Sequence, residues 1–233
     1  MKKLFCVIGL LAFAISAQAQ RAGVSKNQPK YDFQPLHFGF LIGFNQINFK
    51  AVPKLNLNGI DTLLGVHSAN NYGFSLFIIS DLRLGHHWNF RFEPGLSYIQ
   101  RDLIYTLSSK VGETYLSEKK SVESTLVELP LLLKYSSNRV NNHRAYLLGG
   151  MKYNIDMSSQ KDVEIKDLFR LKKFDYSVEF GVGWDFYFQY FKFSPQIRAS
   201  YGLNDLLVRD ESIYTQSIEK LNSRGIYLTL TFE

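Results

Sequence analysis

A strict alternation of large apolar residues with small or charged ones over residues 174–186 constrains the fold of this chain more than any other feature. The apolar members are Phe174, Tyr176, Val178, Phe180, Val182, Trp184 and Phe186, and those between them are Asp175, Ser177, Glu179, Gly181, Gly183 and Asp185. A period of two over this length indicates a β-strand with one apolar and one polar face. In a soluble sheet the apolar face needs a second protein layer, whereas in a membrane barrel it faces lipid and the polar face fills the interior.

The same period recurs along the chain, which allows the membrane interpretation to be tested segment by segment. Seven further strands are expected to begin near Leu36, Tyr72, Trp88, Val122, Ala145, Phe191 and Gly225. Phe77 and Ile79 break the pattern by placing apolar side chains on an inward face. Pro94 cannot donate to a strand ladder, so a bulge is expected there. About eight strands result, the smallest common number for an outer-membrane barrel.

The connections between these segments alternate between long and short, as in outer-membrane barrels. Long loops are predicted at Ile47–Asn71, Leu107–Ser121, Ser158–Lys173 and Leu203–Arg224, and short links at Leu84–His87, Ser136–His143 and Phe188–Tyr190. With both ends on the periplasmic side, every long loop falls on the cell exterior. The sequence therefore predicts an all-β fold: a transmembrane, antiparallel, up-and-down β-barrel of about eight strands. A soluble all-β barrel is the alternative.

The first residues contain the three parts of a secretory signal peptide. Met1-Lys2-Lys3 is basic, Leu4–Ile15 is apolar but too short to cross a bilayer, and small residues lead to a cleavage point after Ala19. The polar stretch that follows contains two prolines and little periodicity, which favours a periplasmic tether. The expected organisation is a signal peptide at 1–19, a periplasmic tether at 20–35 and an outer-membrane β-barrel at 36–233.

Composition excludes several classes of function. Cys6 is the only cysteine and lies in the expected signal peptide, so the mature chain has no disulfide, thiolate nucleophile or thiolate metal site. Loss of Lys2 and Lys3 lowers the formal charge from +6 to about +4. This excess suits an anionic lipid surface, but an ordinary solvated charge balance with no specific partner is the favoured explanation. The basic residues are dispersed among acids without an aromatic platform, so we expect no nucleic-acid binding.

Charged residues of both signs fall on the expected inward faces. They are Arg91, Glu93, Glu128, Lys134, Lys152, Asp156, Asp175, Glu179, Asp185, Lys192 and Arg198. Eight strands enclose an interior that side chains just fill, so we expect no water-filled pore. Buried charges are tolerated only when they are paired and hydrogen-bonded. The sequence therefore predicts a salt-bridged plug, and a substrate- or proton-handling site in the bore is the alternative.

Small outer-membrane barrels include lipid-modifying enzymes, which need a hydroxyl nucleophile and a histidine base. The candidate residues are His37, His67, Ser68, His86, His87 and His143. The pair His86-His87 has no third ligand nearby, and the chain contains neither a Gly-x-Ser-x-Gly elbow nor a phosphate-binding loop. We therefore expect no catalytic, cofactor-binding or metal residues, no cofactor and no small-molecule substrate.

One strand carries a family resemblance. Val122–Tyr135 reads VESTLVELPLLLKY, an acidic-apolar strand that ends in Pro-Leu-Leu-Leu-Lys-Tyr, as in outer-membrane β-barrel proteins of Bacteroidetes. Together with Phe38–Gly43, Asn141-Asn142, Gly149-Gly150 and Lys152-Tyr153, it resembles the PorT (SprT) family.

The resemblance implies a non-enzymatic outer-membrane component required for protein export through the type IX secretion system, which exports proteases, adhesins and gliding machinery. The implied partners are outer-membrane lipid and proteins of the secretion apparatus, contacted through the loops or the periplasmic face. A generic small outer-membrane barrel for adhesion or envelope stability is the alternative.

Overall fold

A computed structural model of the chain describes residues 26–53, 63–69, 71–108, 115–158, 171–209 and 218–233. The expected signal peptide lies outside these residues, and the division of the chain at residues 19 and 35 stays a prediction. The elements are η1 (Tyr31–Phe33), β1 (Leu36–Pro53), β2 (Leu63–Ala69), β3 (Gly73–Arg83), β4 (Trp88–Phe92), β5 (Gly95–Ser108), β6 (Tyr115–Ser136), β7 (His143–Asp156), β8 (Phe174–Tyr187), β9 (Lys192–Gly202) and β10 (Ile218–Phe232). In this part of the chain no helix is long and apolar enough to cross a bilayer.

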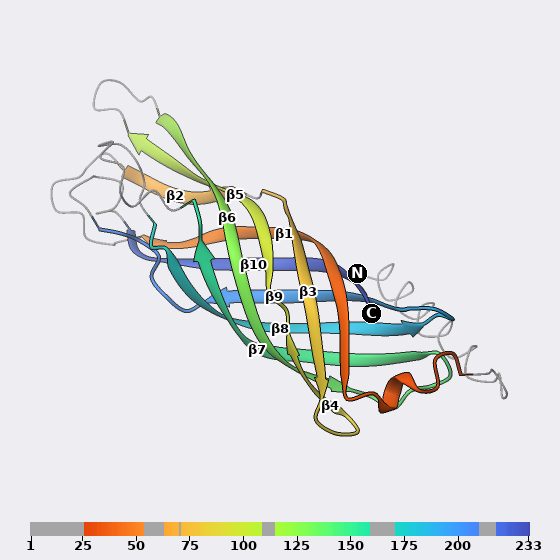
Figure 1. Cartoon of the computed structure of the whole chain (residues 1–233). Coiled ribbons are helices and arrows are strands. Elements are labelled where there is room, and N and C mark those ends of the chain that lie inside the picture. The colour runs from red at the N-terminus through yellow and green to blue at the C-terminus, as the bar shows by residue number, and fades with distance from the viewer. Residues whose placement is uncertain (1–25, 54–62, 70, 109–114, 159–170, 210–217) are drawn as a thin grey trace, which may run out of the picture.

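The strands close into a ring with eight positions (Figure 1). The order runs β1, β10, β9, β8, β7 and β6, then β4 and β5 share one position, and β3 completes the circle by pairing with β1. Every pairing is antiparallel, and neighbours in the ring are mostly neighbours in sequence. The ring confirms the predicted up-and-down barrel of about eight strands.

The third expected strand is divided into β4 and β5 at Pro94. Across this break the ladder keeps its register, because Ile78 donates its N–H to the carbonyl oxygen of Pro94 at 3.0 Å, in line with the pairs Ser80–Phe92 and Phe77–Gly95. The next residue, Gly95, approaches β3 so closely that a Cβ there would lie 2.3 Å from the carbonyl oxygen of Leu76. The bulge expected at Pro94 is therefore wrong: the strand assignment breaks there, but the register toward β3 and toward β6 is the same on both sides of the break, and Gly95 allows the two strands to meet beside it.

The alternation in sequence separates lipid-facing from inward-facing side chains. On β8, Phe180 is 67% exposed while its neighbour Glu179 is 2% exposed. Phe77 and Ile79 are buried inside the barrel, as their inward positions predict. The outward face is apolar because the hydrocarbon of the bilayer has no hydrogen-bond partners for polar side chains.

Residues 26–35, the short links and Glu233 lie at one end of the barrel, which we call the terminal end. The links between β3 and β4, β6 and β7, and β8 and β9 confirm the three short connections that the sequence predicts. We call the opposite end the loop end. Most of the loop expected at Ser158–Lys173 falls outside the described residues.

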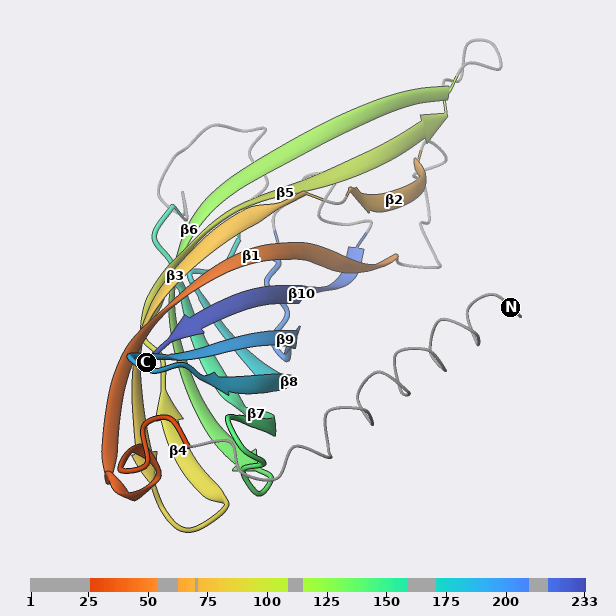
Figure 2. The ribbon, with the colours of Figure 1, turned by 90° about the vertical axis from the view of Figure 1, so that its right-hand side faces the viewer.

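At the loop end the strands are longer than the sequence pattern predicts. The predicted long loops at Ile47–Asn71, Leu107–Ser121 and Leu203–Arg224 are wrong in part, because β1 continues to Pro53, β6 begins at Tyr115 and β10 begins at Ile218. In addition, β2 pairs with β5, and Figure 2 shows β5 and β6 projecting beyond the ring. Main-chain pairing needs no apolar face, so a ladder continues where the lipid pattern has ended.

Candidate functional site

A buried network of ions fills the interior, with Arg91 at its centre on β4. Its Nη2 lies 2.7 Å from Asp81 Oδ2 and 2.8 Å from Glu233 Oε1, and its Nη1 lies 3.3 Å from Glu93 Oε1. All four side chains are at most 1% exposed. The planar guanidinium therefore holds three carboxylates from β3, the β4–β5 junction and the end of β10, which fixes these elements relative to one another.

Glu93 connects this centre to a second layer nearer the loop end. Its other carboxylate oxygen, Oε2, accepts a hydrogen bond from Arg198 Nη1 at 2.7 Å. Beyond it, Lys152 Nζ lies 2.7 Å from Glu128 and 2.8 Å from Glu179. Lys152 also donates to the hydroxyl of Tyr227 at 2.7 Å. Charges of opposite sign thus alternate along the axis of the barrel.

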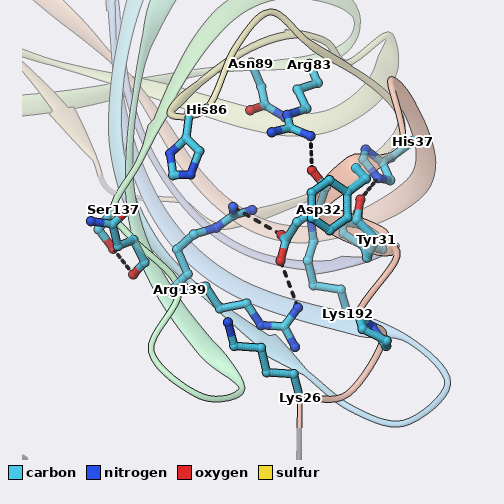
Figure 3. Close-up of a pocket in the computed structure, with 14 residues that line it drawn as sticks. Lys26, Tyr31, Asp32, His37, Arg83, His86, Asn89, Ser137, Arg139 and Lys192 are labelled. Atoms are coloured by element: carbon cyan, nitrogen blue, oxygen red, sulfur yellow. Dashed lines mark hydrogen bonds and ion pairs between the residues drawn. The ribbon is translucent and has the colours of Figure 1, made fainter.

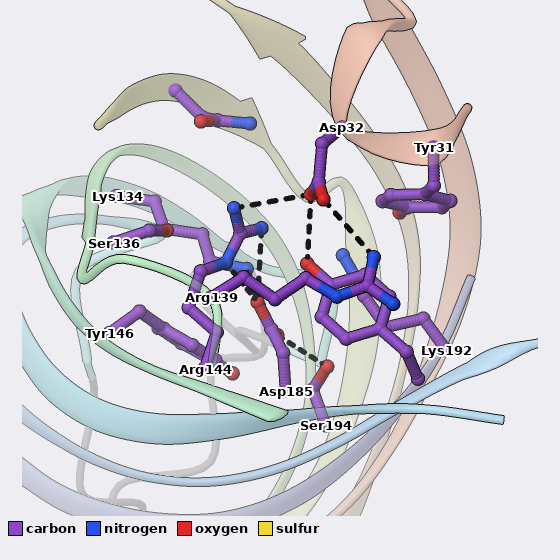
Figure 4. A network of polar contacts seen from close by, with 12 residues as sticks. Tyr31, Asp32, Lys134, Ser136, Arg139, Arg144, Tyr146, Asp185, Lys192 and Ser194 are labelled. Carbon is purple, nitrogen blue, oxygen red and sulfur yellow. Dashed lines mark hydrogen bonds and ion pairs between the residues drawn. The ribbon is translucent and has the colours of Figure 1, made fainter. Parts of the chain in front are cut away.

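A third cluster surrounds Asp185 on β8 (Figure 4). Asp185 accepts hydrogen bonds from Lys134 Nζ at 3.0 Å and from the Ser194 hydroxyl at 2.7 Å, and Arg144 approaches it to 3.4 Å. Nearby, Lys192 Nζ lies 2.7 Å from Glu233 Oε2. Each buried carboxylate in this cluster therefore has a cation beside it, which offsets the cost of removing both charges from water.

The predicted salt-bridged plug is confirmed in most of its members: all eleven inward charges named from the sequence are buried, and all except Asp175 form an ion pair among the described residues. Two inward charges were not predicted: Arg101, which is buried, and Glu233, whose side chain is 0% exposed. For Arg101 a signal was available: Gly95, Ser97 and Ile99 continue the inward alternation of β5 directly to it. For Glu233 the same signal was available, because Tyr227, Thr229 and Thr231 continue the inward alternation of β10 directly to it.

The terminal end of the interior is covered by residues 26–35, which are packed against it (Figure 3). In η1, the Tyr31 hydroxyl donates to Glu233 Oε2 at 2.7 Å, and the Tyr31 ring stacks on His37 with centroids 4.0 Å apart. Asp32 pairs with Arg139 at 3.1 Å and with Arg144 at 3.4 Å. The segment expected to be a tether thus contributes a phenol and a carboxylate to the end of the ion network.

A cavity of about 430 Å³ lies between this segment and the strand ends. We call it the terminal mouth, and the charged side chains that line it are Lys26, Asp32, Arg83, Arg139, Arg144 and Lys192. Five of these six are cations, so the mouth favours anionic groups. Asp32 is the carboxylate that the protein itself places there.

The pKa values at the terminal end follow from burial and from these contacts. Burial by itself raises the pKa of Glu233, but Lys192 and Arg91 outweigh it and hold that pKa below its ordinary value. Burial, followed by the charge of Glu233, raises the pKa of Tyr31 above its ordinary value. Tyr31 therefore keeps its proton and acts as a hydrogen-bond donor to an ionised Glu233.

The candidate histidines do not assemble with a nucleophile. His37 is buried, and its Nε2 contacts the carbonyl oxygen of Tyr31 at 2.9 Å. Ser68 accepts a hydrogen bond from the N–H of Phe49, at the other end of β1. Twelve strand residues separate His37 from Phe49, roughly 40 Å at about 3.3 Å per residue. Ser68 and His37 therefore cannot share an active site.

The other histidines have local partners. His86 and His87 contact each other at 3.2 Å, and His87 Nδ1 lies 2.8 Å from the carbonyl oxygen of Ser136. His143 packs beside Trp184 with ring centroids 5.9 Å apart. The side chain of His67 lies outside the described part of β2. Among the described residues, no three histidine, cysteine or acidic side chains are grouped to hold a metal ion.

The contacts of Asp32 give a first testable expectation. Asp32→Asn removes one charge from two partly exposed ion pairs, so we expect residues 26–35 to detach more readily by about 0.5–1 kcal/mol. Trypsin should then cleave after Lys30 a few times faster, because the cleaved bond must leave the barrel end first. Asp205→Asn, the same change at the loop end, should leave this rate unchanged. Equal rates for wild type and Asp32→Asn would contradict the docking role of Asp32.

Glu233 gives an expectation for pH. Because its pKa is lower in the folded chain than its ordinary value of 4.5, its contribution to stability is complete above that value and is lost as the pH falls below it. We expect the free energy of unfolding, measured with urea in lipid vesicles, to fall less between pH 7 and pH 3 for Glu233→Gln than for wild type. Identical losses in the two proteins would contradict the ion pairs of Glu233.

The closed ring, the lipid-facing apolar wall and the filled interior define a small outer-membrane β-barrel. A family profile described as outer membrane protein beta-barrel domain matches residues 17–208, and the chain belongs to that family. The protein is accordingly an outer-membrane protein. No curated protein matches the chain.

Three solved barrels are similar to the chain. The crystal structure of neisserial surface protein A has 10% identity over 85% of this chain and 98% of its own, with a TM-score of 0.45. OprG from Pseudomonas aeruginosa has 11% identity over 84% of this chain and 93% of its own, with a TM-score of 0.49. The N-terminal barrel of OprF from Pseudomonas aeruginosa has 15% identity over 82% of this chain and 96% of its own, with a TM-score of 0.31.

Proposed function

We propose that this barrel is a non-enzymatic component of the outer membrane that is required for protein export through the type IX secretion system. The observation that supports a role in assembly is the interior, where Arg91, Lys152 and Arg198 are each held by buried carboxylates. An interior packed with paired ions leaves no path for diffusing nutrients. The barrel then acts through its two ends. The resemblance of Val122–Tyr135 to the PorT family supports export as the process served.

In this proposal the terminal end faces the periplasm. The terminal mouth and the docked residues 26–35 form a cationic surface there, which suits an acidic partner of the secretion apparatus. The pair Arg139 and Asp32 holds this surface in one arrangement.

Deletion of the gene for this barrel in the native host tests the proposal. We expect cargo proteins to disappear from the cell surface and the medium and to accumulate in the periplasm, with export restored by a wild-type copy. Complementation with Arg83→Gln/Lys26→Gln, which removes two mouth cations that form no ion pair with a described acidic side chain, should restore export only in part. Lys172→Gln/Arg209→Gln, at the loop end, is the matched control. Normal export in the deletion strain would remove the proposal.

The projecting hairpin of β5 and β6 favours a second function, attachment at the cell surface or support of the envelope. The outer parts of β5 and β6 extend beyond the ring, where they are available to external contacts. Replacement of residues 104–119 by a short turn separates the two functions. Loss of surface attachment with intact export would favour adhesion, whereas loss of export would favour the secretion role.

A further inference from the structure

The outer wall of the barrel carries a basic groove at the loop end, apart from the terminal mouth. It has a volume of about 320 Å³ and is lined by Gln46, Asn48, Phe49, Lys50, Ser68, Arg224, Gly225 and Ile226. Lys50 and Arg224 are its charged members, and both are exposed. The described lining of the groove therefore has two positive charges and no negative one.

The register of the strand pairs places Lys50 and Arg224 side by side on the outer face of the barrel. Arg224 of β10 stands opposite Asn48 of β1, one outward position before Lys50. On its other side, Arg224 stands opposite Tyr201 of β9. Lys50 extends toward the same point, with its Nζ 5.7 Å from the centroid of the Tyr201 ring. Neither cation forms an ion pair with a residue that the structure describes.

The groove lies where the apolar wall ends. Along β1 the outward positions are apolar through Phe44, which is 65% exposed, and polar at Gln46, Asn48 and Lys50. On β10 the last apolar outward residue is Ile226, and Arg224 is the next outward position. A strand rises about 3.3 Å per residue, so Arg224 stands only roughly 7 Å along the strand from Ile226. Basic side chains at this height reach the headgroup layer of the bilayer.

We propose that this groove binds the phosphate of a lipid headgroup in the leaflet at the loop end. Arg224 supplies the planar donor fork that matches phosphate oxygens, and Lys50 supplies a second positive charge. Ile226 and Phe44, immediately below, contact the acyl chains of the same lipid. The occupant is a lipid and not a soluble anion because the groove opens on the wall that faces the membrane.

The test uses the full barrel in zwitterionic detergent and measures bound lipid by native mass spectrometry. Phosphatidic acid is the probe, and diacylglycerol with the same chains is the probe without phosphate. We expect Lys50→Gln/Arg224→Gln to bind phosphatidic acid about tenfold or more weakly than wild type, because each cation near a headgroup contributes to binding. Lys172→Gln/Arg209→Gln, which loses two exposed cations elsewhere at the same end, should bind like wild type.

Two further measurements distinguish lipid binding from a folding defect and from binding of free phosphate. Lys50→Arg/Arg224→Lys keeps both charges and should retain most of the binding, which excludes a general defect of folding. Inorganic phosphate at the concentration of the lipid should displace little phosphatidic acid, because it lacks acyl chains. Unchanged binding in Lys50→Gln/Arg224→Gln, equal retention of diacylglycerol, or full displacement by inorganic phosphate would each overturn the proposal.

Discussion

Replacement of Arg91 by methionine is expected to lower the free energy of unfolding by about 3–5 kcal/mol, the largest effect of any single change considered for this barrel. Methionine fills a similar volume but leaves Asp81, Glu93 and Glu233 without the guanidinium that lies within 3.3 Å of each of them. Glu93 keeps Arg198 and Glu233 keeps Lys192, but Asp81 loses its ion-pair partner, and an uncompensated buried carboxylate is costly. Urea unfolding of barrels refolded into lipid vesicles measures the difference.

Two variants control this result. Arg83→Met removes an arginine whose guanidinium donates to the carbonyl oxygens of Gly85 and Asp32, so its cost should be about 1 kcal/mol. Adding Asp81→Asn to Arg91→Met should restore part of the lost stability, because one stranded charge is then neutral. A loss of less than 1 kcal/mol for Arg91→Met itself would show that the ion network does not stabilise the barrel.

The second large effect is expected on the outer wall. Phe180→Arg places a charge midway between Tyr176 and Trp184 on β8, and we expect it to lower the free energy of unfolding in lipid by about 2–4 kcal/mol. All three residues face outward, and Phe180 is 67% exposed. Because the hydrocarbon cannot solvate a guanidinium, the cost should depend on the depth of the substituted position.

Matched variants separate depth from loss of the phenyl ring. Phe180→Leu keeps an apolar group in the lipid and should cost less than about 1 kcal/mol. Gln46→Arg, at the edge of the apolar wall, should cost no more than about 1 kcal/mol. If Phe180→Arg were as mild as Gln46→Arg, the wall at β8 would not lie in hydrocarbon.

Sequence alone predicted the membrane part of the fold because lipid imposes a chemical pattern on every strand that crosses it. The alternation around Phe180 appears where it was predicted, whereas the bulge predicted at Pro94 does not form, because the register is unchanged across it. The pattern failed beyond the membrane. The extension of β1 to Pro53 and the early start of β6 at Tyr115 depend on main-chain pairing, which leaves no alternation of apolar and polar residues to detect.

The terminal mouth could be predicted least. Asp32 pairs with Arg139, 107 residues away in sequence, and Tyr31 with Glu233, 202 residues away. Residues 26–35 are polar and contain proline, a composition that also describes an undocked linker. Their docking depends on a few specific ion pairs and hydrogen bonds that only the closed ring brings together. The periodicity of the sequence therefore does not predict this docking.

The central claim, that the apolar faces of the strands contact lipid, is tested most directly by spin labels on alternate outward positions. Cys6 is the chain's only cysteine, so expression without residues 1–19 allows single labels at Leu147, Met151, Phe180 and Leu228, all outward-facing and exposed. In lipid vesicles these labels should be accessible to oxygen and shielded from a water-soluble nickel chelate. Free access of the chelate, or shielding from both reagents by a second layer of protein, would contradict the membrane barrel.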